Sequence, residues 1–340
     1  MIPSKEPVSG KKPILDIRGL RVQFFLSEGT VTALDGVDLT IYEKETVGIV
    51  GETGCGKSMT AFSILRLVPG PGKITAGSIR FKGNELLRLT NDQMRGVRGK
   101  MISMIFQDPA TSLDPVFTIG SQLGEVISLH QGIYDKAKLT AKVLQILNLV
   151  KIADPNNVMK QYPHELSGGM KQRVMIALAL SCSPALLIAD EPTTALDVTI
   201  QAQILNLLKD LARKTGSSMM LITHNLGVVA ETCDRVCIMY AGRIVEDAET
   251  FELFARPLHP YTTGLLSAFP KLGERREELA VIRGTVPNLM IPFPGCAFVD
   301  RCDRATDLCM AKKPNRVEVS PGHFVSCHLY RRGDEKPNVG

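Results

Sequence analysis

The stretch GETGCGKS, Gly51 to Ser58, decides the fold of this chain. It follows a short apolar segment, Thr46–Val50, that is typical of a buried strand. It opens a segment with helical spacing, Lys57–Val68, that stops at the sequence PGPG. Glycines at these spacings let backbone N–H groups turn inward around phosphate oxygens, and the start of a helix favours negative charge. The stretch therefore predicts a phosphate-binding loop between a strand and a helix.

Three side chains of this loop have distinct predicted roles. We expect Lys57 to reach the β- and γ-phosphates of a bound nucleotide and Ser58 to ligate Mg²⁺. We interpret Cys55 as a tolerated small side chain and as a potential oxidation liability.

A second apolar segment ends in two acids, in the sequence LLIADE, Leu186 to Glu191. Asp190 at the end of the predicted strand suits the outer coordination shell of a metal ion. Glu191 suits a general base that polarises water for attack on the γ-phosphate. An acidic exit from a strand is the alternative for this motif by itself, but an intact phosphate loop in the same chain favours catalysis.

The sequence LSGGMKQR, Leu166 to Arg173, predicts a second anion site. Ser167 can cap the helix that follows, and two glycines expose backbone N–H groups there. Further features follow in order along the chain: Gln107 after the predicted strand 101–106, the run Ala195-Leu196-Asp197 after the two acids, and His224 at the end of the predicted strand 218–222.

The remaining apolar patterns predict an α/β fold. We expect strands at 14–25, 31–41, 46–50, 78–82, 101–106, 186–189 and 218–222, and helices at 57–68, 119–130, 138–150, from near 167, and at 201–213. Strands that alternate with helices imply a mostly parallel sheet, interrupted by a helix-only section at about 114–181. Past about residue 250 prolines become frequent and periodicity fades, which indicates a small accessory domain.

The composition limits the classes of function. The chain has 340 residues and a net charge of +5, with no concentrated basic stripe, so we expect no nucleic-acid partner. Its first residues are polar, unlike a signal peptide. No apolar run reaches the roughly 20 residues of a membrane helix, because Val174–Ala189 is interrupted by Ser183-Pro184. We therefore expect a soluble, cytoplasmic protein.

In their order along the chain, these motifs resemble those of the nucleotide-binding subunits of ABC transporters, over roughly residues 13–256. The resemblance implies an ABC-type P-loop domain with a mostly parallel sheet core, an antiparallel β subdomain and a helical subdomain inserted at about 107–181. It leaves an N-terminal tail at 1–12 and an accessory domain at 257–340. It implies ATP and Mg²⁺ as ligands.

The same resemblance implies which residues contact the nucleotide. They are Phe24, Gly51, Gly54, Cys55, Gly56, Lys57, Ser58, Met59, Gln107 and Asp190, with Ser58, Gln107 and Asp190 at the Mg²⁺. Phe24 would stack on adenine, although a core phenylalanine on an edge strand is the alternative. Lys57, Gln107, Glu191 and His224 would be catalytic, with Gln107 sensing Mg²⁺ and γ-phosphate and His224 orienting the attacking water.

One chain then holds two half-sites. By resemblance, Ser167, Gly168 and Gly169 would bind the ATP held by a second subunit, and Asp197 would lie at the seam between the subunits. Hydrolysis would need a second nucleotide-binding chain, identical or paralogous. Met170 replaces the commoner glutamine of this loop and Asn225 replaces the usual aspartate after His224, and neither departure should abolish turnover.

Four further stretches resemble the dipeptide/oligopeptide and nickel importer subfamily. They are MIFQDPATSLDP at 104–115, YPHELSGGM at 162–170, PLHPYTTGLL at 257–266 and RGTVPNL at 283–289. One phosphate loop, with no room for a coiled coil between Ser58 and Ser167, argues against the chromosome-maintenance, translation and excision-repair relatives. We interpret the chain as the ATPase subunit that powers import of dipeptides or oligopeptides. The alternatives are a nickel importer subunit, a soluble non-transport ABC ATPase, and an iron–sulfur redox sensor that carries an ATPase.

That interpretation implies partners and a location. The partners would be two membrane permease subunits, a second ATPase subunit and an extracellular or periplasmic peptide-binding protein. The chain would lie peripherally on the cytoplasmic face of the cell membrane.

Four cysteines gather near the C-terminus: Cys296, Cys302, Cys309 and Cys327. Disulfides are disfavoured in the cytoplasm. The C-x₂₋₄-C pairs typical of zinc are missing, although His323 and His328 could replace thiols as ligands. The spacing does not match ferredoxins either, so it decides little. The remaining alternative is unrelated buried thiols, which is how we interpret Cys182, Cys233 and Cys237. Resemblance to peptide-importer ATPases, some of which carry a 4Fe–4S cluster here, favours such a cluster in a mainly structural role.

Overall fold

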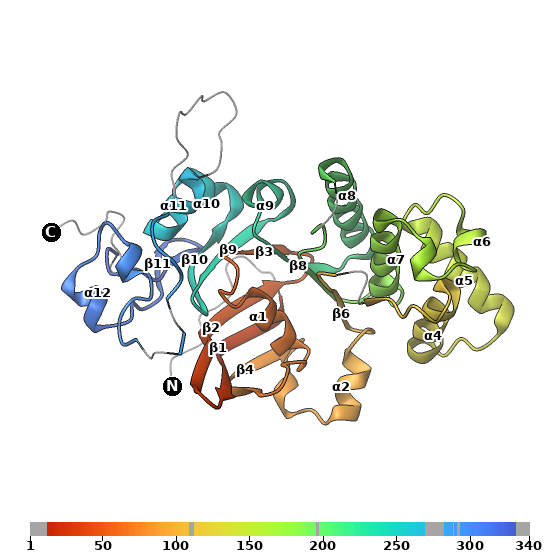
Figure 1. The fold of residues 1–340 in the computed structure, drawn as a ribbon, viewed down its shortest axis with the longest axis horizontal. Helices are drawn as coiled ribbons and strands as arrows, with labels where there is room; N and C mark the ends of the chain where they lie inside the picture. The colour runs from red at the N-terminus through yellow and green to blue at the C-terminus, as the bar shows by residue number, and fades with distance from the viewer. Residues whose placement is uncertain are drawn as a thin grey trace. The chain divides into compact units, whose positions relative to one another are not determined.

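The computed structural model describes residues 12–108, 112–194, 197–268, 282–287, 289–290 and 293–330. The chain divides into two compact units, one formed by Met1–Leu87 with Ile222–Gly340 and the other by Arg88–Leu221 (Figure 1). Among the described residues, no helix has both the length and the apolar composition needed to cross a bilayer.

The first unit contains a four-stranded antiparallel sheet in the order β2-β1-β4-β5. Its strands are β1 (Pro13–Leu26), β2 (Gly29–Tyr42), β4 (Gly72–Phe81) and β5 (Asn84–Glu85). Side chains such as Leu15, Ile17, Leu39 and Ile79 are fully or almost fully buried. Alternation of buried and exposed residues along β1 is what an antiparallel sheet with one covered face requires.

A second group of strands in the same unit has the order β11-β12-β10-β9-β3. These are β3 (Thr46–Val50), β9 (Arg235–Tyr240), β10 (Arg243–Glu249), β11 (Val317–Ser320) and β12 (His323–Val325). The helical elements of the unit are α1 (Lys57–Ile64), η2 (Leu86–Arg88), which ends in the other unit, α9 (Leu226–Thr232), α10 (Thr250–Ala255), α11 (Pro260–Ser267), η4 (Val299–Arg301) and α12 (Asp307–Ala311). β3 runs parallel to β9, whereas the pairs on the other side of β9 are antiparallel.

The second unit combines three neighbouring strands, in the order β8-β7-β6 with β6 and β7 parallel, with seven of the helical elements in the described residues. Its strands are β6 (Ile102–Ile105), β7 (Leu186–Asp190) and β8 (Ser218–Thr223). The last two residues of β8, after Leu221, belong to the first unit. Its helical elements are α2 (Asn91–Val97), α4 (Ile119–Gln131), α5 (Lys136–Leu149), α6 (Pro155–Val158), η3 (Pro163–Glu165), α7 (Gly168–Leu180) and α8 (Val198–Thr215). Helices α4, α5 and α7 pack together, as Figure 1 shows in yellow and green.

The seven expected strands all form, but two expectations were wrong. The first helix ends at Ile64 rather than Val68, because Arg66 takes a left-handed conformation with φ 52° before the prolines are reached. The sheet is mixed rather than mostly parallel, since β10, β12 and β11 add antiparallel strands beside β9.

The C-terminal residues are more regular than the sequence indicated. Strands β11 and β12 form a hairpin that pairs with β10, at Glu246 with Val325. Leu258, Val319, Val325 and Tyr330 make a small apolar core beneath it. The edge of β10 thus supplies the partner that these short strands need.

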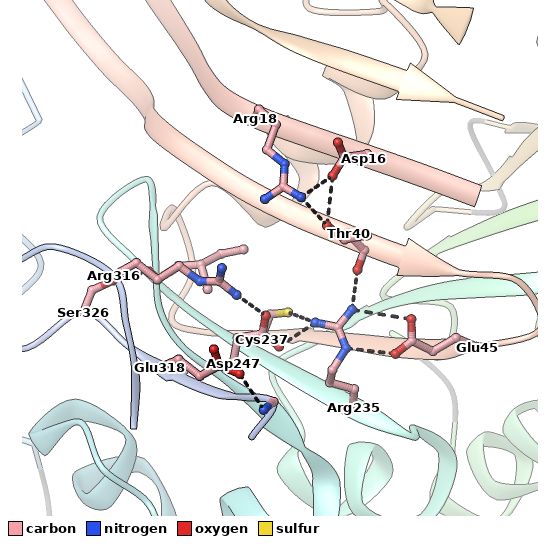
Figure 2. Close-up of polar contacts among 12 residues, drawn as sticks. Asp16, Arg18, Thr40, Glu45, Arg235, Cys237, Asp247, Arg316, Glu318 and Ser326 are labelled. Carbon is pink, nitrogen blue, oxygen red and sulfur yellow. Dashed lines mark hydrogen bonds and ion pairs between the residues drawn. The ribbon is translucent and has the colours of Figure 1, made fainter. Parts of the chain in front are cut away.

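A cluster of charges ties this C-terminal segment to the sheet (Figure 2). Arg235 on β9 donates to the Glu45 carboxylate at 2.8 Å, to Asp247 on β10 at 2.6 Å, and to the backbone carbonyl of Thr40 on β2. Arg316, just before β11, donates to the other oxygen of Asp247 at 2.9 Å. One buried carboxylate therefore joins β9, β10 and the accessory segment.

Candidate functional site

The loop between β3 and α1 has the shape of a phosphate cradle. β3 is buried almost throughout and ends at Val50, and α1 begins at Lys57 with Gly56 as its N-cap. Gly54 and Gly56 have φ values of 80° and 108°, which side-chain-bearing residues rarely adopt. A Cβ on Gly51 would lie 2.1 Å from the carbonyl oxygen of Met239. The three glycines are therefore required by backbone conformation or by close packing.

Lys57 is directed into this loop. Its side chain is buried, and its Nζ donates to the carbonyl oxygens of Gly51 at 2.8 Å and Glu52 at 3.0 Å. Both acceptors are backbone groups of the loop itself, so the ammonium lies where phosphate oxygens would meet it. Contact of Lys57 with the phosphates stays a prediction.

The remaining loop residues differ in accessibility. Ser58 and Met59 are half-buried on the first turn of α1. Cys55 is fully buried, as expected of a tolerated small side chain, and burial raises the pKa of its thiol, which disfavours the reactive thiolate. Phe24 is half-buried on β1 and pairs with Gly72 of β4. A Cβ added to Gly72 would lie 2.7 Å from the ring of Phe24. That contact leaves both interpretations of Phe24 open.

In the second unit, the acids at the end of β7 meet two polar side chains. Gln107 Nε2 donates to Glu191 Oε2 at 3.2 Å, and the hydroxyl of Thr194 donates to the same oxygen at 3.0 Å. Asp190, the residue before Glu191, is buried. The structure therefore brings Gln107 and Glu191 together, although 84 positions separate them.

The backbone at Glu191 is unusual. Its φ of 45° lies in the left-handed region, which costs a non-glycine residue on the order of 1 kcal/mol or more. Gln172 on α7 donates to the next carbonyl, that of Pro192, at 2.5 Å, and Gln201 on α8 donates to the carbonyl of Thr193 at 3.1 Å. These contacts from two helices hold the strained turn that aims the Glu191 carboxylate.

The second predicted anion site is the start of α7. Ser167 is its N-cap, as predicted, and its hydroxyl accepts from the backbone N–H of Met170. Ser167 and Gly168 are exposed and Gly169 is half-exposed, so the first N–H groups of a 13-residue helix are accessible. Asp197, also exposed, precedes α8, whereas Ala195 and Leu196 lie outside the described residues.

His224 lies exposed directly after β8, at the start of the turn into α9. The side chain of the next residue, Asn225, caps α9 by accepting from Gly227 N–H at 2.9 Å and Val228 N–H at 3.3 Å. An amide oxygen accepts these bonds as a carboxylate would, so the asparagine keeps the turn that presents His224.

The structure places the predicted Mg²⁺ ligands on both units. Ser58 belongs to the first unit, and Gln107 and Asp190 belong to the second. Their hydroxyl, amide and carboxylate oxygens are the hard donors that Mg²⁺ takes.

The four C-terminal cysteines line a single pocket. Cys296, Cys302, Cys309 and Cys327 share it with residues that include His259, Phe298 and His328. Burial raises the pKa of the Cys296, Cys302 and Cys327 thiols, and the neighbouring thiols add to this effect; the value for Cys327 is about 12. In the part of the chain that the structure describes, no group of three or more His, Cys, Asp or Glu side chains is placed to hold a metal ion.

The two histidines suggested as zinc ligands differ. His323 is buried, with Nε2 2.9 Å from Glu246 and Nδ1 3.4 Å from Glu252, so both ring nitrogens are engaged away from the cysteines. His328 lines the cysteine pocket, but its Nε2 donates to the carbonyl of Lys312 at 2.7 Å. Cys233 and Cys237 are buried, as expected, whereas Cys182 is half-buried.

Several residues of these sites had no role assigned from the sequence. Thr194 and Gln172 support Glu191, but neither residue type is distinctive in its motif. Tyr261 belongs to the stretch PLHPYTTGLL, which indicated only the subfamily, yet its hydroxyl accepts from the backbone N–H of Glu52 in the phosphate loop at 3.0 Å. Only the tertiary structure identifies them.

Comparison with known proteins supports the assignment of these motifs. Residues 34–194 match the ABC transporter family, and residues 245–309 match the C-terminal region of oligopeptide/dipeptide transporters. The chain is 54% identical to the probable peptide ABC transporter ATP-binding protein y4tR of Sinorhizobium fredii, over 92% of this chain and 94% of that protein. It is 50% identical to the dipeptide transport ATP-binding protein DppD of Bacillus subtilis, over 93% of this chain and 94% of that protein.

A solved structure gives the same fold. The ATP-binding cassette MJ0796, in a dimeric post-hydrolysis state bound to ADP and Pi, aligns with a TM-score of 0.63 and 27% identity, over 69% of this chain and 98% of that one. With relatives at about half identity over nearly the whole chain, the family predicted from the motifs is confirmed. The chain belongs to the ATP-binding subunits of peptide ABC transporters, the ATPases of dipeptide and oligopeptide importers.

Proposed function

We propose that this subunit binds Mg-ATP at its phosphate loop and hydrolyses it together with a second ATPase subunit, to drive peptide import through a membrane permease. The observation that carries the proposal is the loop between β3 and α1, with Lys57 directed inward between two carbonyls. A buried ammonium at the start of a helix suits the multiply charged end of a nucleoside triphosphate.

Binding is assigned to the residues of the loop. Lys57 attracts the β- and γ-phosphates, while the N–H groups of Gly51, Gly54, Cys55 and Gly56 and the first turn of α1, with Ser58 and Met59, surround them. Phe24 would stack on the adenine. Bound Mg²⁺, held by Ser58, Gln107 and Asp190, would neutralise charge that develops on the phosphates.

Hydrolysis is assigned to Glu191 as the general base. Its carboxylate is held by Gln107 and Thr194, on a turn fixed by Gln172, so it can accept a proton from water without a search over rotamers. His224 would bond the γ-phosphate and orient that water. Gln107 would report the presence of Mg²⁺ and γ-phosphate, since it contacts the base directly.

The shared site follows from α7. The accessible N–H groups at Ser167, Gly168 and Gly169 would bind the γ-phosphate held by the partner chain, with Asp197 near the seam. ATP would then join the two subunits, and hydrolysis would separate them. The similar cassette MJ0796 is a dimer with bound ADP and Pi, which supports this arrangement.

The test is Glu191→Gln in the full chain. It removes the base, an effect of about 10²–10⁴ in rate, but keeps an acceptor of the same shape. We expect slow turnover and a nucleotide-dependent dimer of ATPase subunits, measured by gel filtration with Mg-ATP and the cognate partner. Lys57→Ala is the matched control, in which neither binding nor dimer should be seen. A Glu191→Gln protein that never dimerises with its partner would refute the shared site.

Docking to the permease is assigned to the helical part of the second unit. Val116 and Phe117, before α4, are 70% and 52% exposed, and Leu129 and Tyr134 are 72% and 78% exposed. Such apolar exposure, on the helical subdomain of a peripheral ATPase at the cytoplasmic face of the membrane, fits a cytoplasmic helix of the permease. A cysteine at Val116 should crosslink to the permease, whereas crosslinks confined to residues 257–330 would contradict this docking.

The complete importer would contain two permease subunits, a second ATPase subunit and a peptide-binding protein outside the membrane. Within this chain we assign residues 13–256 to the nucleotide-binding domain, with its helical subdomain at about 107–181, and residues 257–340 to the accessory domain.

We propose that the four cysteines hold a 4Fe–4S cluster. The donor set fits: four thiols from one segment line one pocket, which is the ligand count of such a cluster. Cluster ligands bind different irons, so their sulfurs need not converge on one point as they would around a single zinc ion. The cluster would fix the accessory segment much as metals stabilise small folds.

Purification without oxygen tests this assignment. The protein should be brown and contain about four irons per chain. A colourless anaerobic preparation with one zinc per chain would overturn the assignment of an iron–sulfur cluster, and the four thiols would then be a zinc site.

A further inference from the structure

A buried arginine of the accessory segment contacts the phosphate loop. The side chain of Arg301 is only 6% exposed, and its two terminal nitrogens each donate to one carboxylate oxygen of Glu52, both at 2.9 Å. Its Nε donates to the carbonyl of Arg283 at 2.8 Å, and Nη1 also reaches the Tyr240 hydroxyl at 3.3 Å. A bidentate pair with every nitrogen engaged fixes the orientation of both side chains.

Glu52 is itself a central part of the loop. It follows Gly51, and its backbone carbonyl accepts from Lys57 Nζ at 3.0 Å and from Cys55 N–H at 3.3 Å. Its backbone N–H donates to the Tyr261 hydroxyl at 3.0 Å. The peptide groups on both sides of the Glu52 side chain thus orient the loop and its lysine.

The same arginine is adjacent to the cysteine pocket. Arg301 immediately precedes Cys302, and its guanidinium lies 5.8 Å from the ring centroid of Phe298, which lines that pocket. Phe298 packs on Tyr240 and Tyr261, with ring centroids 5.2 Å and 5.4 Å away. One continuous set of side chains therefore runs from the cysteines to the phosphate loop, within a single unit.

We propose that Arg301 is a positioning residue for ATP: by clamping Glu52, the accessory segment presets the phosphate loop and Lys57 for binding. Arg301 touches no nucleotide in this scheme and acts through Glu52 alone. The inference rests on the proposed nucleotide site, but not on which metal the cysteines hold. Its consequence is that disturbance of the cysteine segment weakens ATP binding in the same chain.

The Arg301–Glu52 ion pair could also serve only to stabilise the fold. The experiment therefore separates the affinity for Mg-ATP from the stability of the protein. Arg301→Met should raise the dissociation constant for Mg-ATP about tenfold, within the 5–150-fold range usual for coupled sites, while kcat at saturating ATP changes little. Arg301→Lys, which keeps the charge but not the fork, should give an intermediate constant. Calorimetric titration of the full-length protein measures the affinity.

Arg316→Met is the matched control. Arg316 is another arginine of the accessory segment that pairs with a core carboxylate, Asp247, and among the described residues its contacts are with Asp247 and the ring of Phe324 rather than with the loop. Its loss should lower the melting temperature and leave the Mg-ATP constant unchanged. If Arg316→Met weakens ATP binding as much as Arg301→Met, the effect is general destabilisation and the inference fails.

A second variant keeps the proposal testable if Arg301→Met does not fold. Glu52→Gln leaves the packing of Arg301 intact, and it should weaken ATP binding to a similar extent. The double variant Glu52→Gln/Arg301→Met should bind no more weakly than either single one, because both remove the same interaction. Additive losses would refute the clamp.

Lys57→Ala distinguishes failure of this inference from failure of the proposed function. If Lys57→Ala has lost ATP binding while Arg301→Met and Glu52→Gln bind like the wild type, the nucleotide site stands and the clamp is wrong. If Lys57→Ala itself binds ATP normally, the nucleotide site is misassigned and both proposals fall.

Discussion

At the scale of single residues, the Glu191 carboxylate, which we propose as the general base, contacts one predicted site residue, Gln107, and one that the sequence did not indicate, Thr194. Glu191 has a φ of 45°, and Gln107 and Thr194 both donate to its Oε2. A carboxylate that accepts two hydrogen bonds in a strained turn has one preferred orientation, which is what a general base needs. Thr194 therefore helps to orient the proposed base, although the LLIADE motif does not include it.

Thr194→Val should lower kcat about tenfold, because a hydrogen bond to a charged group contributes about 1.5–3 kcal/mol and its loss lets the base reorient. The KM for ATP should change little, since the hydroxyl contacts the base and not the phosphates in this scheme. Steady-state ATPase measurements give both constants. Thr194→Ser retains the hydroxyl and should retain activity, and a Val variant as active as the Ser variant would contradict this role.

At the scale of elements, a buried carboxylate adds to the strand pairing and the aromatic packing that join the accessory segment to the sheet. Asp247 on β10 accepts from Arg235 of β9 and from Arg316 before β11, as Figure 2 shows. Burial raises the pKa of Asp247, but the two arginines lower it by more, and the net pKa lies below its ordinary value. The carboxylate is therefore charged throughout the neutral range.

Asp247→Asn should lower the free energy of unfolding by about 3 kcal/mol, because it leaves a buried arginine with less compensating charge. Thermal melts followed by circular dichroism measure the change. Asp92→Asn is the control: Asp92 pairs with Arg95, but their side chains are 87% and 80% exposed, so its loss should shift stability very little. Equal effects from the two variants would show that burial of the Asp247 cluster is unimportant.

The pH dependence of this contribution has a definite sign. The unfolded chain protonates Asp247 at its ordinary pKa of 3.8, whereas the folded chain holds its proton only at lower pH. The contribution of the ionised Asp247 to the free energy of unfolding is therefore complete above pH 3.8 and is lost as the pH falls below that value. The difference in stability between wild type and Asp247→Asn should therefore shrink below about pH 4, and a constant difference down to pH 2 would refute the assignment.

At the scale of the whole molecule, the four cysteines and the phosphate loop belong to one compact unit, although Arg301 and Glu52 are 249 positions apart. Contacts of such long range make the accessory segment part of the nucleotide-binding unit in space. The sequence presents it as a separate, weakly periodic tail.

Cys302→Ser should lose the cluster that we propose and make residues 293–330 more sensitive to protease, because the pocket loses one of its four thiols. ATP should still bind, but more weakly, since Arg301 is the preceding residue. Metal analysis, limited proteolysis and nucleotide titration follow the three effects. Cys182→Ser, in the other unit, is the control and should change none of them; unchanged metal content in Cys302→Ser would refute the four-cysteine site.

The features that are encoded locally were identified by sequence analysis. The phosphate loop, the Ser167 cap and the buried strands β3, β7 and β8 are recognisable because glycine conformations, cap hydrogen bonds and apolar runs each involve only a few consecutive residues. Those same motifs were enough to indicate the family and the ATPase chemistry.

Tertiary structure alone decided what depends on distant partners. The hairpin of β11 and β12 is short and forms beside the edge of β10, so no local pattern predicted it. Thr194 and Arg301 are ordinary residue types whose importance comes from the carboxylates they meet, Glu191 through a turn and Glu52 across the unit. Hydrogen bonds and ion pairs are short-ranged, and which groups come within about 3 Å is fixed only when the chain is folded.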